Sequence, residues 1–359
     1  MRRLVVVVIG VFVAGTLLAG LVLAQGAPPV FLPLVIANGP NYPTPTPTQT
    51  SVATATTTAT ATPTATVTRT PTATPTATPG GGLAVENYQT YVDGVAGGLH
   101  VVGEVVNGEM SNMSLLRANI TLLQDGQPVY NQTQPSLVFS LRPGERAPFD
   151  ASLGTPPNYT SYTIDASGQP TAQDPVDQFT ILSQRTFTET ANTLALVGEL
   201  RNDTGGNVTF VTVTGTFYQA NGLVWRAGQS YTMLGKLAAG QRSPFKLTAY
   251  GPQQIASEAL IMRAITSSTP PRGDLTVVSS NVTVQGTVLL ITGQVRNDGG
   301  TTASNVQVVA SLYDAGNQII NAGVSDTSTL AAGASGPFSI TIPANWQGYT
   351  TMDLQVQGN

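Results

Sequence analysis

Gly293-Gln294-Val295-Arg296-Asn297 has two related copies earlier in this chain of 359 residues. The second copy is Gly198-Glu199-Leu200-Arg201-Asn202, and the first is Gly103-Glu104-Val105-Val106-Asn107. The asparagines stand at 107, 202 and 297, and 202 − 107 and 297 − 202 both give 95. Solenoid repeats have periods of about 20–50 residues, so this longer period predicts tandem whole domains.

The residues around each copy follow the period of a β-strand. In the second copy Leu194, Leu196, Gly198 and Leu200 alternate with residues that would point to the opposite face. This pattern predicts an antiparallel strand with one buried and one exposed face. We expect the glycine to leave room for a bulky group from the facing sheet, and Asn202 to end the strand in a turn.

A second signal recurs after each predicted hairpin. A leucine, two further residues and a glycine are followed by a Pro-Phe pair, and the glycine-to-proline distance is 148 − 144 = 4, 244 − 240 = 4 and 337 − 333 = 4. The glycine is expected to turn the chain and the phenylalanine to enter the core. Many short strands separated by turn residues, without an amphipathic helix, predict an all-β, two-sheet sandwich.

These motifs resemble those of the bacterial FxLYD domain, an immunoglobulin-like β-sandwich of exported proteins. The third unit is the most similar, with Ser311-Leu312-Tyr313-Asp314, and the second has Thr216-Phe217-Tyr218-Gln219. The first has Thr121-Leu122-Leu123-Gln124, while Ile120, Gly215 and Ala310 occupy the place of the phenylalanine that names the family. The resemblance covers residues 83 to 359. It implies three tandem immunoglobulin-like sandwiches of about seven strands each, and no catalytic residues.

The N-terminal part predicts export. Arg2 and Arg3 precede an apolar run from Leu4 to Leu23, typical of a signal peptide cleaved before Gln25 or of an uncleaved membrane anchor. A Thr/Pro-rich tract follows, and its composition predicts a disordered stalk. The predicted segments are 1–24 (signal or anchor), 25–39 (short apolar segment), 40–82 (Thr/Pro/Gly linker) and three sandwiches at 83–170, 178–268 and 274–359.

Composition excludes several classes of protein. Charged residues make up only 9% of the chain, its net charge is −4, and it has no basic cluster beyond the N-terminus, so no nucleic-acid partner is expected. The chain contains no cysteine, which excludes disulfides and thiol chemistry. The sandwiches must therefore be stabilised by hydrophobic cores.

Few residues are candidates for chemistry. His100, the only histidine, is predicted to face outward without partners, and Asp203 and Asp298 stand in equivalent turns where capping is favoured over calcium binding. No catalytic, cofactor-binding or metal-binding residue is predicted. Trp225 and Trp346 are weak candidates for a ligand contact, with local packing as the alternative.

We therefore expect a non-enzymatic protein, extracellular or on the cell surface, that serves in structural display or adhesion. Its expected partner is an extracellular protein or a polysaccharide, with membrane contact only through an uncleaved anchor at residues 4–23. The alternative is a module that binds a glycan or polymer through exposed Trp and Tyr rings. An enzymatic function has no residues to support it.

Overall fold

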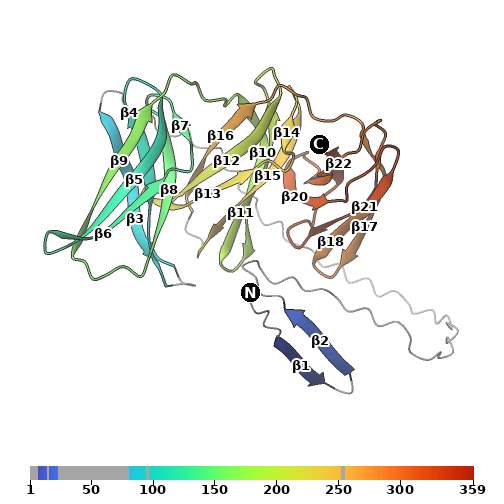
Figure 1. Cartoon of the computed structure of the whole chain (residues 1–359), viewed down its shortest axis with the longest axis horizontal. Coiled ribbons are helices and arrows are strands. Elements are labelled where there is room, and N and C mark those ends of the chain that lie inside the picture. The colour runs from blue at the N-terminus through green and yellow to red at the C-terminus, as the bar shows by residue number, and fades with distance from the viewer. Residues whose placement is uncertain (1–6, 14–15, 23–80, 94–96, 252–254) are drawn as a thin grey trace, which may run out of the picture. The chain divides into compact units, whose positions relative to one another are not determined.

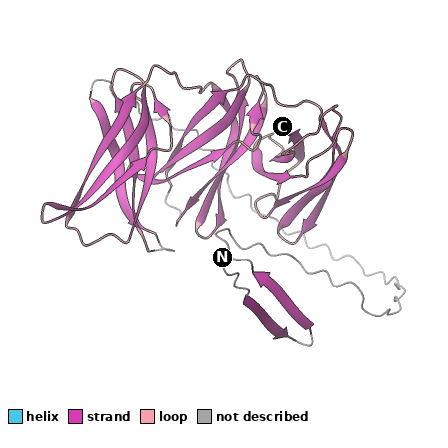
Figure 2. Cartoon of the chain, in the orientation of Figure 1, coloured by secondary structure: helices cyan, strands magenta, loops and turns pink. Residues whose placement is uncertain are grey.

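The computed structural model describes residues 7–13, 16–22, 81–93, 97–251 and 255–359. All regular structure in these residues is β-strand, as Figure 2 shows. The chain divides into two compact units, Met1–Ala65 and Thr66–Asn359, which are described separately. The predicted apolar segment (25–39) and nearly all of the predicted linker (40–82) lie outside the described residues.

In the first unit, β1 (Val7–Val13) pairs antiparallel with β2 (Thr16–Val22). Across the described residues, no helix has the length and apolarity needed to cross a membrane.

The second unit contains three successive pairs of antiparallel sheets (Figure 1). In sandwich 1 (residues 82–170), one sheet has the order β3-β4-β8, and the other has the order β6-β5-β7 with β9 paired to β5. The strands are β3 (Gly82–Val92), β4 (Leu99–Gly108), β5 (Met113–Gln124), β6 (Gln127–Pro135), β7 (Ser140–Leu141), β8 (Arg146–Gly154) and β9 (Ser161–Pro170).

Sandwich 2 (residues 179–266) repeats this topology, with the sheets β10-β11-β15 and β13-β12-β14, and with β16 paired to β12. Its strands are β10 (Phe179–Thr190), β11 (Thr193–Asn202), β12 (Val208–Tyr218), β13 (Val224–Tyr231), β14 (Lys236–Leu237), β15 (Arg242–Tyr250) and β16 (Ser257–Thr266).

Sandwich 3 (residues 275–357) has the sheets β17-β18-β21 and β20-β19-β22. Its strands are β17 (Leu275–Gln285), β18 (Val288–Asn297), β19 (Gln307–Tyr313), β20 (Ile319–Asp326), β21 (Ser335–Ile342) and β22 (Thr351–Gln357). Here an isolated bridge between Ala303 and Leu330 stands where the other sandwiches have a short strand. The all-β, antiparallel sandwich architecture predicted from the sequence is confirmed.

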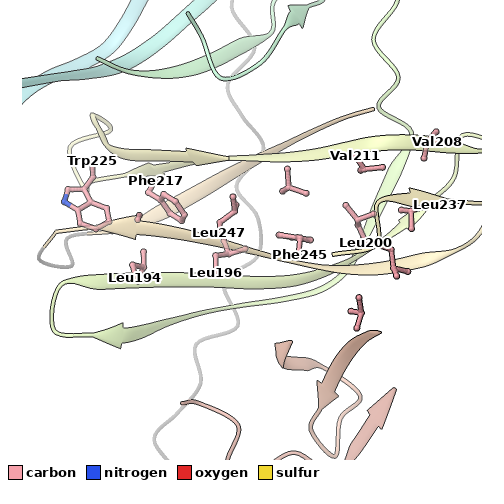
Figure 3. Close-up of a cluster of buried hydrophobic side chains, with 14 residues drawn as sticks. Leu194, Leu196, Leu200, Val208, Val211, Phe217, Trp225, Leu237, Phe245 and Leu247 are labelled. Atoms are coloured by element: carbon pink, nitrogen blue, oxygen red, sulfur yellow. The ribbon is translucent and has the colours of Figure 1, made fainter. Parts of the chain in front are cut away.

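Each sandwich has its own hydrophobic core between its two sheets. In sandwich 2, Leu196 and Leu200 from β11 meet Phe217 and Trp225 from β12 and β13 (Figure 3). Phe245 of the predicted Pro-Phe pair is fully buried in the same cluster. Its counterparts Phe149 and Phe338 occupy the cores of sandwiches 1 and 3. Burial of apolar surface is the main stabilising term for such cores, about 25 cal/mol per Å².

The recurring glycine makes room for this phenylalanine. A Cβ on Gly198 would lie 2.4 Å from the Phe245 ring, and a Cβ on Gly293 would lie 2.6 Å from the Phe338 ring. Gly198 and Phe245 are cross-strand partners on β11 and β15. The predicted notch is therefore present, but the group that fills it comes from the neighbouring strand of the same sheet and not from the facing sheet.

The recurring asparagine does more than end a strand. Asn107, Asn202 and Asn297 are fully buried. The Asn202 amide Nδ2 donates to the carbonyl oxygens of Gly206 (2.8 Å), Leu237 (3.1 Å) and Ala238 (2.9 Å). The Asn202 main chain also bonds with the turn before β15, since the Gly240 amide donates to its carbonyl. This one side chain thus connects both recurring sequence signals.

The predicted exposed face of the motif strand differs among the sandwiches. In β18 buried residues alternate with less buried ones, as the sequence predicts. Nearly every residue of β4 and β11 is buried, including Glu104 and Glu199. The prediction of one exposed face is therefore wrong for sandwiches 1 and 2, because a neighbouring sandwich covers that face.

Replacing Asn202 with alanine is expected to lower the free energy of unfolding by about 2–4 kcal/mol, because three buried or part-buried carbonyl oxygens lose their donor. Urea denaturation of the full chain measures this loss. The control Asn221→Ala alters an exposed hairpin residue and should cost well under half as much. Equal costs for the two variants would contradict the role given to Asn202.

Candidate functional site

The two tryptophans differ in burial. Trp225 is only 3% exposed and belongs to the core of sandwich 2. Trp346 is half-buried against the core of sandwich 3, and its indole Nε1 donates to the Thr287 carbonyl oxygen at 2.6 Å. Local packing thus describes Trp225, and Trp346 stays a weak candidate for a ligand contact. Trp225 has no exposed ring to offer a ligand.

His100 has partners that the sequence did not reveal. Its Nδ1 lies 2.9 Å from an Asp150 carboxylate oxygen and 3.1 Å from the Tyr91 hydroxyl. The imidazole stacks on the Tyr91 ring at a centroid distance of 4.7 Å, and the Arg226 guanidinium of sandwich 2 lies 3.5 Å from that ring's centroid. Burial and the Asp150 carboxylate raise the pKa of Tyr91. His100 thus belongs to a contact between sandwiches 1 and 2.

The turn carboxylates are paired with arginines. Asp203 bonds the Arg201 side chain at 2.6 Å, and Asp298 bonds the Arg296 side chain. These bonds, more than any other contact, hold the pKa of each carboxyl below its usual value. In the described part of the chain, no cluster of three or more His, Cys, Asp or Glu residues is arranged to hold a metal ion.

A buried tyrosine–glutamate bond occurs at both joints between sandwiches. The Tyr218 hydroxyl of sandwich 2 donates to Glu104 Oε1 of sandwich 1 at 2.5 Å. The Tyr313 hydroxyl of sandwich 3 donates to Glu199 Oε1 of sandwich 2 at 2.6 Å. Burial, together with the neighbouring carboxylate, raises the pKa of both tyrosines. Each hydroxyl therefore keeps its proton at neutral pH and remains a donor.

An arginine completes each buried pair. Arg146 lies 3.2 Å from Glu104 Oε2 and 3.3 Å from Glu86. At the second joint Arg242 lies 3.7 Å from Glu199 Oε2. A buried carboxylate is strongly destabilising unless it is paired and hydrogen-bonded. The tyrosine of the next sandwich thus compensates, with the arginine, for burying the glutamate.

Apolar side chains from both neighbours surround these bonds. At the first joint Val102 clusters with Tyr218, Val224 and Ala259 of the next sandwich. The corresponding cluster at the second joint contains Phe187, Ala195 and Val197 of sandwich 2 and Tyr313, Ile319 and Ala322 of sandwich 3. The sheet that carries the motif strand therefore packs through its outer face on the following sandwich.

Polar side-chain contacts also cross both joints. Arg263 of β16 bonds Glu145 of sandwich 1 at 2.7 Å and is 3.6 Å from Asp177 in the connecting segment. At the second joint the Gln357 side chain accepts from the Lys236 amide at 2.9 Å and donates to the Lys236 carbonyl at 2.5 Å. Each connection is thus fixed by side chains as well as by the chain itself.

An exposed aromatic pair distinguishes sandwich 2. Phe210 and Tyr231 are each 61% exposed, and their rings meet edge to face at a centroid distance of 6.3 Å. Phe210 has a φ of 50°, a left-handed conformation that a bulky side chain rarely adopts. Its counterparts are Leu115 (φ 52°) and Asn305 (φ 47°), and 210 − 115 and 305 − 210 both give 95.

The recurrence of this backbone conformation explains the strain. Each sandwich requires a left-handed residue at this place, and only sandwich 3 fills it with asparagine, which tolerates that conformation. Sandwich 2 instead holds a large exposed ring there. Non-glycine residues held in such conformations cost about 1–3 kcal/mol and cluster at functional sites. The 95-residue spacing of Leu115, Phe210 and Asn305 was the available sequence signal, but it carries no information on φ.

Comparisons with known proteins add little to this geometry. No protein-family model matches the chain, and no curated protein sequence matches it. Among solved structures, the chain is similar to the one described as the crystal structure of dimeric latent PorU from Porphyromonas gingivalis. The identity is 10% and the TM-score 0.15, and the match covers 77% of this chain and 32% of the PorU chain. The match thus spans about a third of the PorU chain.

Replacing Phe210 with asparagine is expected to raise the free energy of unfolding by about 1 kcal/mol, because the left-handed strain is relieved and little burial is lost. Chemical denaturation of the full chain measures the change. The reciprocal variant Asn305→Phe should be destabilised by a similar amount. A Phe210→Asn variant less stable than the parent would show that the ring contributes packing that outweighs its strain.

Proposed function

We propose that this protein is a non-catalytic, exported protein that displays tandem immunoglobulin-like sandwiches of the FxLYD type and acts in adhesion. The observation that carries the proposal is the joint seen twice in the chain. Tyr218–Glu104 and Tyr313–Glu199 bonds, each enclosed by apolar side chains, join the sandwiches through their sheet faces. Contacts of this kind suit a protein that holds a binding surface at a distance.

Export is the first element of the proposal. The N-terminal signal at residues 1–24 would direct the chain outward, and the Thr/Pro-rich tract at 40–82 would carry the sandwiches away from the cell surface. The segment at 4–23 is either removed before Gln25 or kept as a membrane anchor. The partner is then an extracellular protein or a polysaccharide.

The contact surface that we propose is centred on Phe210 and Tyr231. An exposed aromatic pair provides a large apolar area with few rotatable bonds, and aromatic residues are enriched among the anchors of binding interfaces. The left-handed backbone is shared with Leu115 of sandwich 1, so the exposed ring and its contact with Tyr231 distinguish Phe210. A phenylalanine in this left-handed conformation lowers the stability of sandwich 2 relative to an asparagine.

A glycan- or polymer-binding module is the second candidate. The flat faces of aromatic rings stack on sugar rings, and the low charge of the chain suits an uncharged polymer. With Trp225 in the core, the exposed ring that we choose for this hypothesis is that of Tyr231, because it lies beside Phe210. The proposed polymer contact therefore uses the same surface as the proposed adhesive contact.

Binding separates the proposed contact from a structural role. In the full chain, Phe210→Asn and Tyr231→Ser should each reduce retention on cells or on insoluble polysaccharide by about tenfold, as expected for loss of an anchor worth about 1.4 kcal/mol. The matched control Leu115→Asn changes the equivalent place in sandwich 1 and should leave retention unchanged. Retention by Phe210→Asn and Tyr231→Ser equal to that of the parent would exclude this surface.

Cleavage of the N-terminal segment and its retention as an anchor place the chain in different cell fractions. A chain starting near Gln25 in the culture medium is the result expected after cleavage, and an intact chain in the membrane pellet is the result expected for an anchor. N-terminal sequencing of both fractions distinguishes them. An intact chain found in the cytosol would contradict export.

A further inference from the structure

In each sandwich, the sheet that contains the motif strand (β4, β11 or β18) has an outer face that points away from the core. This face carries different residues where the next sandwich covers it and where no sandwich does. Covered faces present a valine, a glutamate and an arginine, and the free face of sandwich 3 presents a threonine, a glutamine and a serine at the same register positions. The three sets are Val102, Glu104 and Arg146 in sandwich 1, Val197, Glu199 and Arg242 in sandwich 2, and Thr292, Gln294 and Ser335 in sandwich 3.

The outer face of the other sheet also differs between the sandwiches that dock on a preceding one and sandwich 1. Sandwiches 2 and 3, which dock on the sandwich before them, carry a tyrosine at the end of the central strand and an alanine on the strand next to it. The free face of sandwich 1 has a leucine and an asparagine at these positions. The pairs are Tyr218 and Ala227 in sandwich 2, Tyr313 and Ala322 in sandwich 3, and Leu123 and Asn131 in sandwich 1.

Both free faces satisfy their polar groups locally or with solvent. On sandwich 1 the Thr121 hydroxyl donates to Asn131 Oδ1 at 2.8 Å, and Asn119 donates to Ser167 at 3.0 Å. On sandwich 3 β21 alternates buried residues with the exposed Ser335, Pro337, Ser339 and Thr341. Polar groups that are satisfied in this way do not require a neighbouring sandwich to cover them.

The loss of the docking residues leaves the recurring fold motif of sandwich 3 intact. Sandwich 3 keeps the buried Asn297, the glycine Gly293 and the core Phe338, which serve its own fold. What it lacks is the set that would dock a further sandwich. The valine, the glutamate and its arginine are thus replaced together, on a face that no other sandwich covers in the described part of the chain.

We propose that these faces form a directional docking system for sandwiches of this type. A Val–Glu–Arg face accepts the Tyr–Ala face of the following sandwich, and the Thr–Gln–Ser face of sandwich 3 and the Leu–Asn face of sandwich 1 are closed to it. The contact is heterologous, because the two partners use different faces. A chain with both end faces open would associate head to tail into filaments, and the closed faces prevent this.

The partner that an opened face fits is a second copy of this chain. Restoring the docking residues should therefore turn the chain into a self-associating protein. The opened variant carries Leu123→Tyr and Asn131→Ala on sandwich 1, with Thr292→Val, Gln294→Glu and Ser335→Arg on sandwich 3. Every introduced residue already occupies the corresponding place in another sandwich of the same chain, so the fold should accept it.

Sedimentation velocity of the full chain provides the test. The opened variant should form species larger than the parent's, growing with concentration, with an association constant at least about tenfold above that of the parent, as for one buried, charge-assisted hydrogen bond. A control with only the sandwich 3 substitutions has the Val–Glu–Arg face but no exposed Tyr–Ala face to dock on it. This control should sediment like the parent. Opened chains that sediment like the parent, or a control that associates equally, would overturn the proposal.

Removing the docking residues from an existing joint tests the same proposal in the opposite direction. Val102→Thr, Glu104→Gln and Arg146→Ser give sandwich 1 the face of sandwich 3. Proteinase K should then cut the connecting segment 171–178 about tenfold faster than in the parent, because the joint opens more often. The untouched segment 267–274 serves as the internal reference and should be cut at the parental rate. An unchanged rate at 171–178 would overturn the docking role of these residues.

Discussion

A carboxylate taken out of water needs partners, and this requirement governs how the sandwiches connect. Glu104 and Glu199 are 1% and 2% exposed, and each receives a tyrosine hydroxyl from the following sandwich and an arginine from its own. Leaving such a group without its donor costs more than the bond itself contributes. The glutamate thus makes the joint selective, because its burial is tolerable only when the neighbour that covers it also supplies the tyrosine hydroxyl.

Within each sandwich the buried asparagine has the comparable role. Its side chain satisfies carbonyl groups of two turns that are distant in sequence, and its main chain bonds the turn that precedes the Pro-Phe strand. The 95-residue period therefore has two physical sources. Asn202 and Gly198 recur because every sandwich needs them to fold, and Glu199 and Tyr218 recur only where two sandwiches meet.

Much of the fold was predictable because it depends on local patterns. Alternating residues located the strands, and the spacing of the glycine and Pro-Phe signals located the core phenylalanines. The prediction that one face of β11 is exposed was wrong. Alternation of apolar and polar residues identifies the face that packs in the strand's own core, but it cannot show that another domain covers the opposite face. Ala195 and Val197 on that face were the available sign, since two apolar residues there suit burial better than exposure. The aromatic pair was missed for another reason: the left-handed φ of Phe210 is a property of the backbone.

The most direct test of this account is a double-mutant cycle on the first joint, with Glu104→Gln, Tyr218→Phe and their combination, read as free energies of unfolding of the full chain. Since the hydroxyl donates to a buried charge, the account predicts that the two substitutions are non-additive, with a coupling energy of about 1.5–3 kcal/mol. Strictly additive effects would contradict it, because they would mean that the buried carboxylate does not depend on the tyrosine of the neighbouring sandwich.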